Sequence, residues 1–340
     1  MTSREIVRRT LDYDRPERVA RSFADSDFAH AHCTAPTRAT QWRQTGAGRW
    51  ERLDEWGNLW ARLDAHSKGE VLRGALDGTR ELSACQFPDF SRPEHYLKVR
   101  ATRAQHPDKW LIGGLPGFTF NIARKLRKLE NYLADLLEEP DWIGQLHDRV
   151  DAVLEPMIRN YAAAGADAIM FPEDWGTQTQ LMIRPELWRR EFFPRFRKLC
   201  GVARQGGLRV FMHSCGQNED IVPGLMEAGV ELLQFDQPDL HGLDRLAAHQ
   251  DRGRITFWCP VDIQKTLQTR DEQTIRARAR EMLDKLWRGR GGFIAGFYSD
   301  NASIGLETRW QEYACDEFVR RGVSKKGGRR KEKGETSKTG

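Results

Sequence analysis

The sequence lacks the features of a membrane or exported protein. None of its apolar runs approaches the roughly 18 residues that a membrane-spanning helix needs. The first nine residues carry charges where a signal peptide would have its apolar region. The six cysteines stand singly, without a CxxC pair or the spacing of a disulfide framework. We therefore expect no membrane association, reduced cysteines and a cytoplasmic location.

Excess charge is also missing from most of the chain. The formal net charge is +5, yet residues 321–340 hold eight Lys or Arg and only two Glu, so the rest of the chain is almost neutral. That terminal stretch is rich in Lys, Gly and Ser and poor in apolar residues. We expect it to be a disordered, solvated tail. We expect a small-molecule substrate rather than nucleic acid as the partner, and the sequence does not specify an oligomeric state.

The N-terminal part of the chain has an irregular pattern. Residues 3–13 predict a helix and residues 19–23 a first strand. Residues 24–100 are rich in Trp, Arg and Gly and have few long periodic segments. Within them, residues 50–63 alternate as in a β-hairpin with a Gly-Asn turn. We interpret residues 24–100 as an insertion packed over one end of the domain.

From about residue 101 one pattern repeats: a helical segment, a glycine, a short apolar strand and a polar tip. Such strands cover residues 110–113, 166–171, 208–212, 230–235, 254–258 and 293–295. Strands that alternate with helices must pair in parallel through crossovers. There are at least seven strand candidates, and no GxGxxG opens any of them. We therefore predict an α/β fold, a (β/α)8 TIM barrel over residues 1–320, in preference to an open doubly wound sheet.

The stretch Arg209-Val-Phe-Met-His-Ser-Cys-Gly-Gln-Asn218 carries the clearest chemical signal. Its first four residues predict a buried strand. His213 and Cys215 follow two positions apart, so they point to the same side while the backbone stays extended. An imidazole and a thiolate suit a metal such as zinc. Taken alone, the pair is more typical of a hydrogen-bonded His beside a buried Cys, but its place at a predicted barrel mouth favours the metal.

Polar side chains end the other predicted strands too. Glu173 and Asp174 are the candidate catalytic residues, able to orient an acceptor or to hydrogen-bond a ligating imidazole, although each would also suit a helix cap. Cys259 is the candidate third metal ligand, because a catalytic zinc usually has three protein ligands, with Glu173 as the alternative. Cys259 would also suit a buried packing position. The candidate substrate-binding residues, chosen by position, are Trp175, Gln178, Asp236, Asp262, Gln264 and Tyr298.

The sequence resembles the uroporphyrinogen decarboxylase superfamily, in its methyltransferase-like branch. The resemblance rests on Thr2-Ser-Arg-Glu-Ile-Val with Asp14-Arg-Pro-Glu-Arg-Val, Asp54-Glu-Trp-Gly57, Pro172-Glu-Asp-Trp-Gly-Thr-Gln178, His213-Ser-Cys-Gly216 and Val261-Asp-Ile-Gln264. These stretches keep the family's order from residue 2 to about residue 320. The superfamily contains the decarboxylases and the cobalamin-dependent methyltransferases, which move a methyl group from a corrinoid to a thiol. The resemblance implies the barrel fold.

Each of the two activities lacks a part here. The methyltransferases of the superfamily bind zinc through His-x-Cys and a later Cys. His213 and Cys215 match the first two, and residues 296–299, where the third is expected, hold no cysteine. The decarboxylases have an N-terminal Arg-Gly motif that binds the carboxylates of the substrate. It is not found around residues 19–23, although Arg18 and Arg21 are nearby.

We interpret the chain as a metal-dependent, methyltransferase-like enzyme that moves a methyl group between a corrinoid and a thiol or another small acceptor. The resemblance implies zinc as the cofactor, a corrinoid such as methylcobalamin as the co-substrate and a corrinoid protein as a partner. A thiol bound to zinc loses its proton and becomes a nucleophile at neutral pH. The alternatives are a porphyrin-type decarboxylase and a non-catalytic corrinoid- or metal-binding protein.

Overall fold

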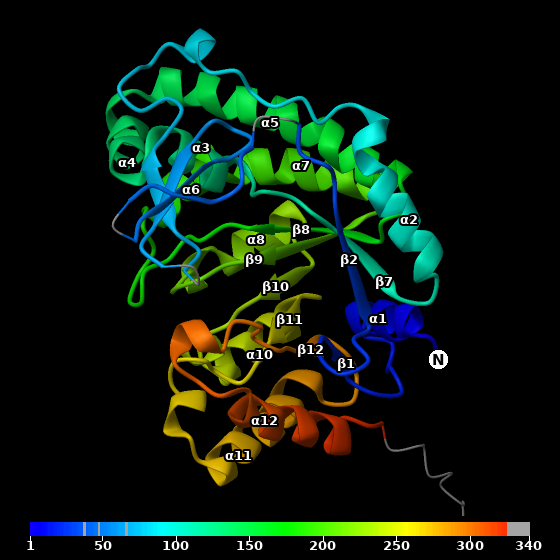
Figure 1. Cartoon of the computed structure of the whole chain (residues 1–340). Helices are drawn as coiled ribbons and strands as arrows, with labels where there is room; N and C mark the ends of the chain where they lie inside the picture. Colours follow the sequence, from blue (N-terminus) through cyan, green and yellow to red (C-terminus); the bar gives the residue numbers. More distant parts are fainter. Residues whose placement is uncertain (37–38, 47, 65–66, 325–340) are drawn as a thin grey trace, which may run out of the picture.

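The computed structural model describes residues 1–324, apart from 37–38, 47 and 65–66. Within these residues, eight parallel strands form one curled sheet in the order β1-β12-β11-β10-β9-β8-β7-β2 (Figure 1). They are β1 (Ala20–Arg21), β2 (Phe28–His32), β7 (Trp110–Gly114), β8 (Ala168–Pro172), β9 (Arg209–His213), β10 (Leu232–Gln234), β11 (Thr256–Cys259) and β12 (Phe293–Ala295). Because β1 pairs with β12, the first strand meets the last. The predicted (β/α)8 barrel is confirmed.

Helices between consecutive strands cover the outer face of this sheet (Figure 1). They are α2 (Leu97–Gln105), α3 (Thr119–Arg127), α4 (Leu129–Glu138), α5 (Pro140–Ala163), α6 (Pro185–Glu191), α7 (Phe193–Gln205), α8 (Val222–Ala228), α9 (Pro238–His241), α10 (Leu243–Arg252) and α11 (Glu272–Met282), followed after β12 by α12 (Thr308–Arg321). None of the described helices is long and apolar enough to cross a membrane.

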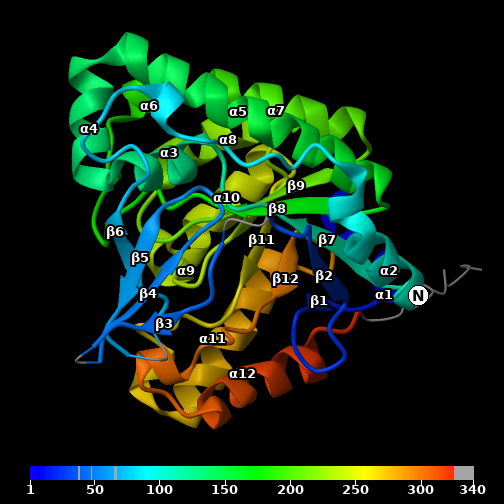
Figure 2. The same ribbon diagram turned by 45° about the horizontal axis from the view of Figure 1, so that its top comes forward.

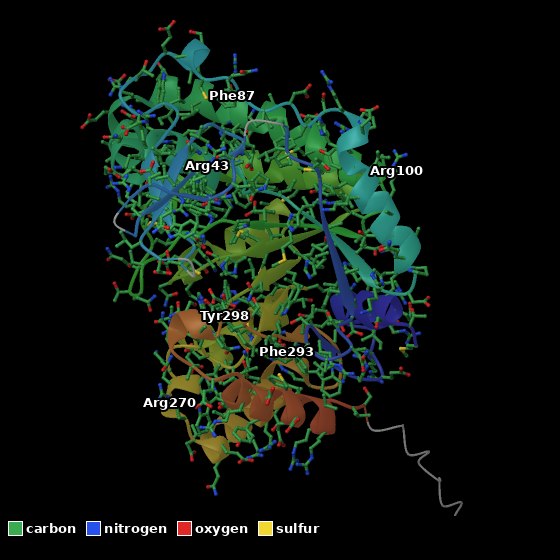
Figure 3. The ribbon with its side chains drawn as sticks, in the orientation of Figure 1. Arg43, Phe87, Arg100, Arg270, Phe293 and Tyr298 are labelled. Carbon is green, nitrogen blue, oxygen red and sulfur yellow. The ribbon has the colours of Figure 1, made fainter. Side chains whose placement is uncertain are left out.

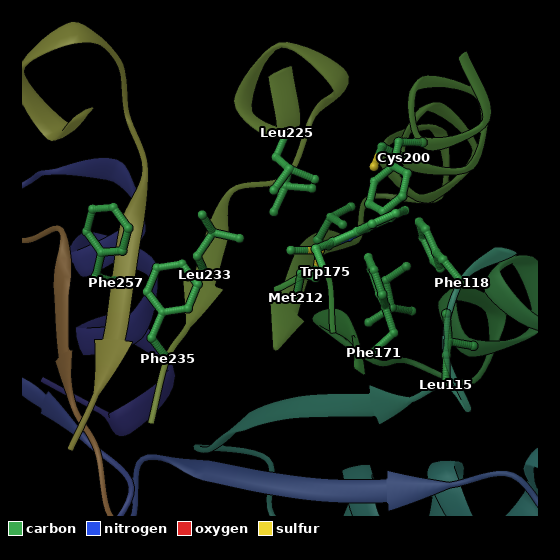
Figure 4. Close-up of a cluster of buried hydrophobic side chains, with 14 of the residues drawn as sticks. Leu115, Phe118, Phe171, Trp175, Cys200, Met212, Leu225, Leu233, Phe235 and Phe257 are labelled. Carbon is green, nitrogen blue, oxygen red and sulfur yellow. The ribbon is translucent and has the colours of Figure 1, made fainter. Parts of the chain in front are cut away.

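The barrel interior and the layer under the helices form two separate cores. Inward-facing strand residues such as Phe28, Phe211 and Trp258 fill the interior, and the rings of Phe28 and Trp258 stack with centroids 4.6 Å apart. The helix α1 (Ser3–Asp12), predicted over 3–13, packs its apolar stripe against this interior core. The outer core holds the alternate strand residues and the facing helix residues (Figure 4). Alternate residues of each strand therefore belong to different cores.

The insertion contains a second, antiparallel sheet of β3 (Arg43–Gln44), β4 (Trp50–Leu53), β5 (Leu59–Arg62) and β6 (Glu70–Arg73). The predicted hairpin is β4 with β5. Both oxygens of the buried Asp54 carboxylate accept hydrogen bonds in its turn, Oδ1 from the amide of Asn58 and Oδ2 from the side-chain amide of the same residue, each at 2.9 Å. The turn is therefore held by side chains rather than by sheet contacts alone.

The predicted start of the insertion at residue 24 is wrong. β2 pairs with β7 in the main sheet, and α2 follows as a barrel helix, so the insertion runs from about residue 33 to 96. From Ala29 the strand Phe28-Ala-His-Ala-His alternates apolar and polar residues, which is typical of a half-exposed strand. Its histidines face the barrel interior instead, on the same side as Phe28.

The predicted tail boundary at residue 321 is also too early. α12 ends at Arg321, and the next residues run along the N-terminal segment. The amide of Val19 donates to the carbonyl of Gly322 at 2.7 Å, and the amide of Ser324 donates to the carbonyl of Glu17 at 2.8 Å. The remainder of the predicted tail, residues 325–340, lies outside the described residues.

Candidate functional site

The register of the parallel strands places the end of β9 on the inner face of the barrel. His213 pairs with Gln234 of β10, and Gln234 pairs with Trp258 of β11. Trp258 belongs to the interior core, as does Phe211, two residues before His213. Paired residues of neighbouring strands point to the same face. The imidazole of His213 therefore faces the barrel mouth, at the carboxyl ends of the strands.

Asp174, His213 and Cys215 bring three potential ligand atoms together at this mouth. A carboxylate oxygen of Asp174, an imidazole nitrogen of His213 and the Sγ of Cys215 all lie within 4.8 Å of one another. His213 Nε2 lies 3.3 Å from Cys215 Sγ and 3.7 Å from Asp174 Oδ1. The backbone amide of Cys215 donates to Asp174 Oδ1 at 2.9 Å, which holds the two loops together. We call these three residues the rim cluster.

A chain of hydrogen bonds selects the tautomer of His213. The side-chain amide of Gln234 donates through Nε2 to Asp236 Oδ1 at 2.7 Å, because a carboxylate can only accept. That leaves Gln234 Oε1 to accept a hydrogen bond from His213 Nδ1. With its proton on Nδ1, a neutral imidazole presents a lone pair at Nε2, toward Asp174 and Cys215. This is the arrangement that orients histidine ligands in metal sites.

Two glycines fix the distance between the loops that carry Asp174 and Cys215. A Cβ on Gly216 would lie 2.2 Å from the carbonyl oxygen of Gly176, and a Cβ on Gly176 would lie 2.3 Å from the carbonyl oxygen of Gln217. Gly216 also has a φ of +76°, a region that favours glycine. The amide of Gln217 donates to the carbonyl of Thr177 at 2.7 Å. The two loops thus pack backbone against backbone.

The donor set of the rim cluster fits zinc. For tetrahedral zinc with ordinary bond lengths, the nitrogen, sulfur and oxygen ligands stand roughly 3.4–3.6 Å apart. The separations of 3.3 and 3.7 Å lie close to that range. Surrounding protein atoms, followed by the carboxylates of Asp174 and Asp236, raise the pKa of Cys215 to about 12. A nearby cation is therefore needed for this thiol to become a thiolate at neutral pH.

Cys259 does not join the rim cluster, contrary to the prediction from the sequence. It follows the inward-facing Trp258 in β11, so its side chain points to the opposite face. There it is completely buried in the outer core, together with Phe257. Burial raises the pKa of its thiol above the ordinary range. Among the described residues, Asp174 is the third potential ligand beside His213 and Cys215, where the sequence predicts Cys259.

Glu173, the alternative ligand and candidate catalytic residue, also faces away from the mouth. Its carboxyl group is fully buried, and Oε2 accepts a hydrogen bond at 2.7 Å from the amide of Asn121 in α3. Burial raises the pKa of Glu173 to about 8, although Arg124 opposes the shift. Glu173 is therefore a protonated anchor for α3 at neutral pH. The two consecutive carboxyl groups therefore point in opposite directions: Asp174 faces the barrel mouth, and Glu173 faces the surrounding helices.

Two of the predicted substrate-binding residues have structural roles instead. Trp175 is completely buried in the outer core (Figure 4). The ring of Phe120 stacks on it, with the ring centroids 4.3 Å apart. Asp262 is buried in a turn, where Oδ1 accepts from the amides of Gln264 and Lys265 at 2.9 and 2.7 Å. Neither side chain is free to contact a substrate.

The other predicted substrate-binding residues are either accessible to a ligand or support the rim cluster through hydrogen bonds. Gln178 is exposed, and its side-chain amide pairs reciprocally with that of Gln237 at 3.2 and 3.3 Å. Asp236 supports Gln234, as described above. Gln264 is exposed, and Tyr298 is partly exposed after β12, in the lower half of the molecule in Figure 3, away from the labelled insertion residues.

Three residues at or near the mouth escaped the sequence-based prediction. His30 and His32 lie on the inner face of β2, and both are exposed. Their signal is the two-residue alternation from Ala29 to His32, within the range interpreted from the sequence as an insertion. Arg124 of α3 lies 3.4 Å from Asp174 Oδ2. No sequence pattern connects Arg124 to β8, because the contact joins distant segments.

A family model and one solved structure agree with this fold. The family model described as uroporphyrinogen decarboxylase (URO-D) matches residues 71–297, more than half of the chain. A methyltransferase from Methanosarcina mazei has a similar structure, with a TM-score of 0.60 and 16% sequence identity over 76% of this chain and 73% of that one. A 3-keto-L-gulonate-6-phosphate decarboxylase from Vibrio cholerae aligns less well, with a TM-score of 0.35 and 12% identity over 67% of this chain and 80% of that one. No curated protein sequence matches the chain.

Proposed function

The chain belongs to the uroporphyrinogen decarboxylase family, and we propose that it is a zinc-dependent, methyltransferase-like enzyme whose metal is held by Asp174, His213 and Cys215. The observation that carries the proposal is the rim cluster, in which three different ligand atoms converge at the barrel mouth. The orientation of His213 Nε2 by Gln234 and Asp236 supports it further.

Asp174, His213 and Cys215 would supply three protein ligands, the number usual for a catalytic zinc with one open position. When bound, zinc would supply the positive charge that removes the proton from a small thiol substrate. The sulfur of that thiol would form a bond to a methyl carbon presented by a corrinoid, and the methyl–corrinoid bond would break with its electron pair staying on the corrinoid. A corrinoid protein is the proposed carrier of this co-substrate.

The surrounding residues would divide the work of binding and orientation. Gln234 and Asp236 keep the proton of His213 on Nδ1, so that Nε2 can bind a metal. Arg124 interacts with Asp174 Oδ2 and leaves Oδ1 directed at the rim cluster. Gln178, Gln264 and Tyr298 stay proposed substrate contacts. In place of the catalytic roles expected for the two carboxyl groups, we propose a ligand role for Asp174 and an anchoring role for Glu173.

The decarboxylase alternative loses Arg18, one of the two cations near the first strand, among the described residues. It needs free cations near the first strand to bind the carboxylates of a substrate. Arg18 forms a bidentate pair with Asp27, with nitrogen–oxygen distances of 2.5 and 2.8 Å, and Asp27 is completely buried. A guanidinium held in this way is not available to a substrate.

A methyl-transfer assay tests the proposal. We expect the purified protein to methylate a small thiol with methylcobalamin, to lose this activity on treatment with a chelator and to regain it with zinc. His213→Ala should be inactive, while His106→Ala, a matched change at an exposed histidine, should retain activity. Zinc binding without methyl transfer to any thiol would indicate the non-catalytic alternative, and activity that survives in His213→Ala would refute the proposed site.

A further inference from the structure

A cavity of about 550 Å³ lies outside the barrel mouth, between the insertion sheet and the junction of α3 and α4. Trp60 and Glu70 line it from the insertion, and Arg124, Lys125 and Lys128 line it from the helices. Figure 2 shows β5 and β6 next to α3 and α4, below them in that view. A smaller cavity of about 220 Å³ adjoins it, and Trp60 and Lys125 line both. Trp60 and Lys125 therefore lie where the two cavities meet.

Lys125 forms no ion pair within 4 Å in the part of the chain that the structure describes, although the carboxyl groups of Glu173, Asp54 and Asp174 act on it from further away. Its ammonium group lies 5.5 Å from the centroid of the Trp60 ring. Burial, followed by the charge of Arg124, lowers the pKa of Lys125. A partly buried ammonium without a close ion pair is unfavourable, and a bound anion in direct contact would relieve that cost. The environment of Lys125 is therefore complementary to a negative charge.

The wall of the cavity is held in place independently of any ligand. Trp60 Nε1 donates to Oδ2 of the buried Asp54 at 2.7 Å. The guanidinium group of Arg52 also lies over the Trp60 ring, 5.4 Å from its centroid. Because Arg52 and Lys125 already lie over the Trp60 ring, an aromatic ligand has little room to stack on it. The site therefore suits a compact anionic group better. The geometry is fixed before binding, which lowers the entropic cost of binding a ligand.

Two further cations lie beside Lys125. Arg124 donates two hydrogen bonds to Asn121 Oδ1, at 2.7 and 3.0 Å, which orient its guanidinium group. Lys128 pairs with Glu130 at 2.8 Å and has a φ of +62°, which is unusual for a residue other than glycine. Strained backbone of this kind occurs preferentially at ligand sites. Glu130 and Lys128 thus neutralise each other, and Glu70 is the second acid of the lining, so the net positive charge of the cavity comes from Arg124 and Lys125.

We propose that this cavity binds a compact oxyanion, the phosphate or carboxylate group of a small metabolite, with Lys125 as its main contact and Arg124 and Lys128 beside it. Arg124 also lies 3.4 Å from Asp174, so the bound anion would be separated from the rim cluster by a single guanidinium group. The anion site does not depend on the proposed metal or on methyl transfer.

Isothermal titration calorimetry of the full chain, purified with its metal, tests the site with inorganic phosphate and with succinate as probes. We expect one of them to bind with a dissociation constant of about 1 mM or tighter, and Lys125→Met to weaken that binding at least tenfold. Lys125→Met keeps the apolar stem over Trp60 and removes only the charge. Lys125→Arg should retain binding, and so should Lys198→Met, at an exposed lysine that does not line the cavity.

Each outcome decides the proposal. Binding of phosphate alone identifies a phosphoryl group as the ligand chemistry, and binding of succinate alone identifies a carboxylate. No binding of either probe at about 10 mM overturns the proposal. Equal binding by the wild type and Lys125→Met also overturns it. A thermal melt of Lys125→Met accompanies the titration, and if that variant is unfolded, Lys128→Met is compared with Lys198→Met under the same criterion.

Discussion

Cys215 and Cys259 both stand at the end of a barrel strand, yet they lie on opposite sides of the barrel wall. Cys215 is exposed beside His213 and Asp174, whereas Cys259 is completely buried under the helices. The adjacent carboxyl groups of Glu173 and Asp174 also lie on opposite sides: Glu173 is buried against α3, and Asp174 contacts Cys215 at the mouth. At a barrel rim, the face on which a side chain lies decides whether it can take part in chemistry, and nearness to the strand end is not enough.

The largest expected effect separates the two cysteines. Cys215→Ser should lower zinc affinity by more than about 100-fold, because losing a ligand costs more than losing the residue that orients it. Cys259→Ser should leave zinc affinity within about threefold of the wild type and cost about 1 kcal/mol of stability through its buried polar replacement. Competition with a chelator measures the zinc affinity. An equal loss of zinc affinity in the two variants would contradict the placement of Cys215 and Cys259 on opposite faces of the barrel.

The second effect concerns Glu173, on the outer side. Its pKa of about 8 in the folded protein exceeds the ordinary 4.5, so the folded state retains a proton that the unfolded state loses between these values. The stability from this carboxyl group is present below about pH 4.5 and declines by up to about 1.4 kcal/mol for each pH unit as the pH rises toward 8.

Glu173→Gln keeps the shape of the side chain and cannot ionise. Relative to the wild type, its free energy of unfolding should therefore increase as the pH rises from about 5 to about 8. Denaturant unfolding of both proteins at several pH values gives this difference. A difference that does not change with pH would show that Glu173 is ionised in the folded protein.

The third effect tests the contact between the two loops. Gly216→Ala introduces a Cβ 2.2 Å from the Gly176 carbonyl, whereas Gly207 has the same φ of +76° and nothing within 4 Å of the corresponding position. Gly207→Ala should therefore cost only the backbone strain, about 1 kcal/mol, and Gly216→Ala a further 1–3 kcal/mol together with a loss of zinc affinity. Equal costs in the two variants, measured by denaturant unfolding, would mean that the loops are not closely packed.

The smallest effect lies in the support of the imidazole. Gln234→Leu removes the acceptor of His213 Nδ1 without touching a ligand atom. Zinc affinity should fall by about 10- to 100-fold, less than in Cys215→Ser. The same chelator competition measures it, with Gln178→Leu as the control on an exposed glutamine. An unchanged affinity in Gln234→Leu would show that the orientation of His213 comes from elsewhere.

The repeated alternation of helix, glycine and strand was enough to predict the barrel, and the spacing of His213 and Cys215 identified two members of the rim cluster. The face of Cys259 could not be predicted, because Thr-Phe-Trp-Cys in β11 is buried on both sides and shows no polar alternation. The alternation in β2 was present, but the surrounding Trp-rich composition assigned it to the insertion. The contact between Arg124 and Asp174 joins segments 50 residues apart, and only the fold brings them together.

X-ray absorption of the zinc-loaded protein tests the central claim most directly, because it counts the sulfur ligands. With Asp174, His213 and Cys215 as the ligands, the spectrum should show one sulfur at about 2.3 Å and the remaining nitrogen and oxygen ligands at about 2.0–2.2 Å. A spectrum with two sulfur ligands from the protein would contradict the assignment of the rim cluster if that number stayed the same in the Cys215→Ser variant. It would also contradict the assignment if the number fell to one in the Cys259→Ser variant.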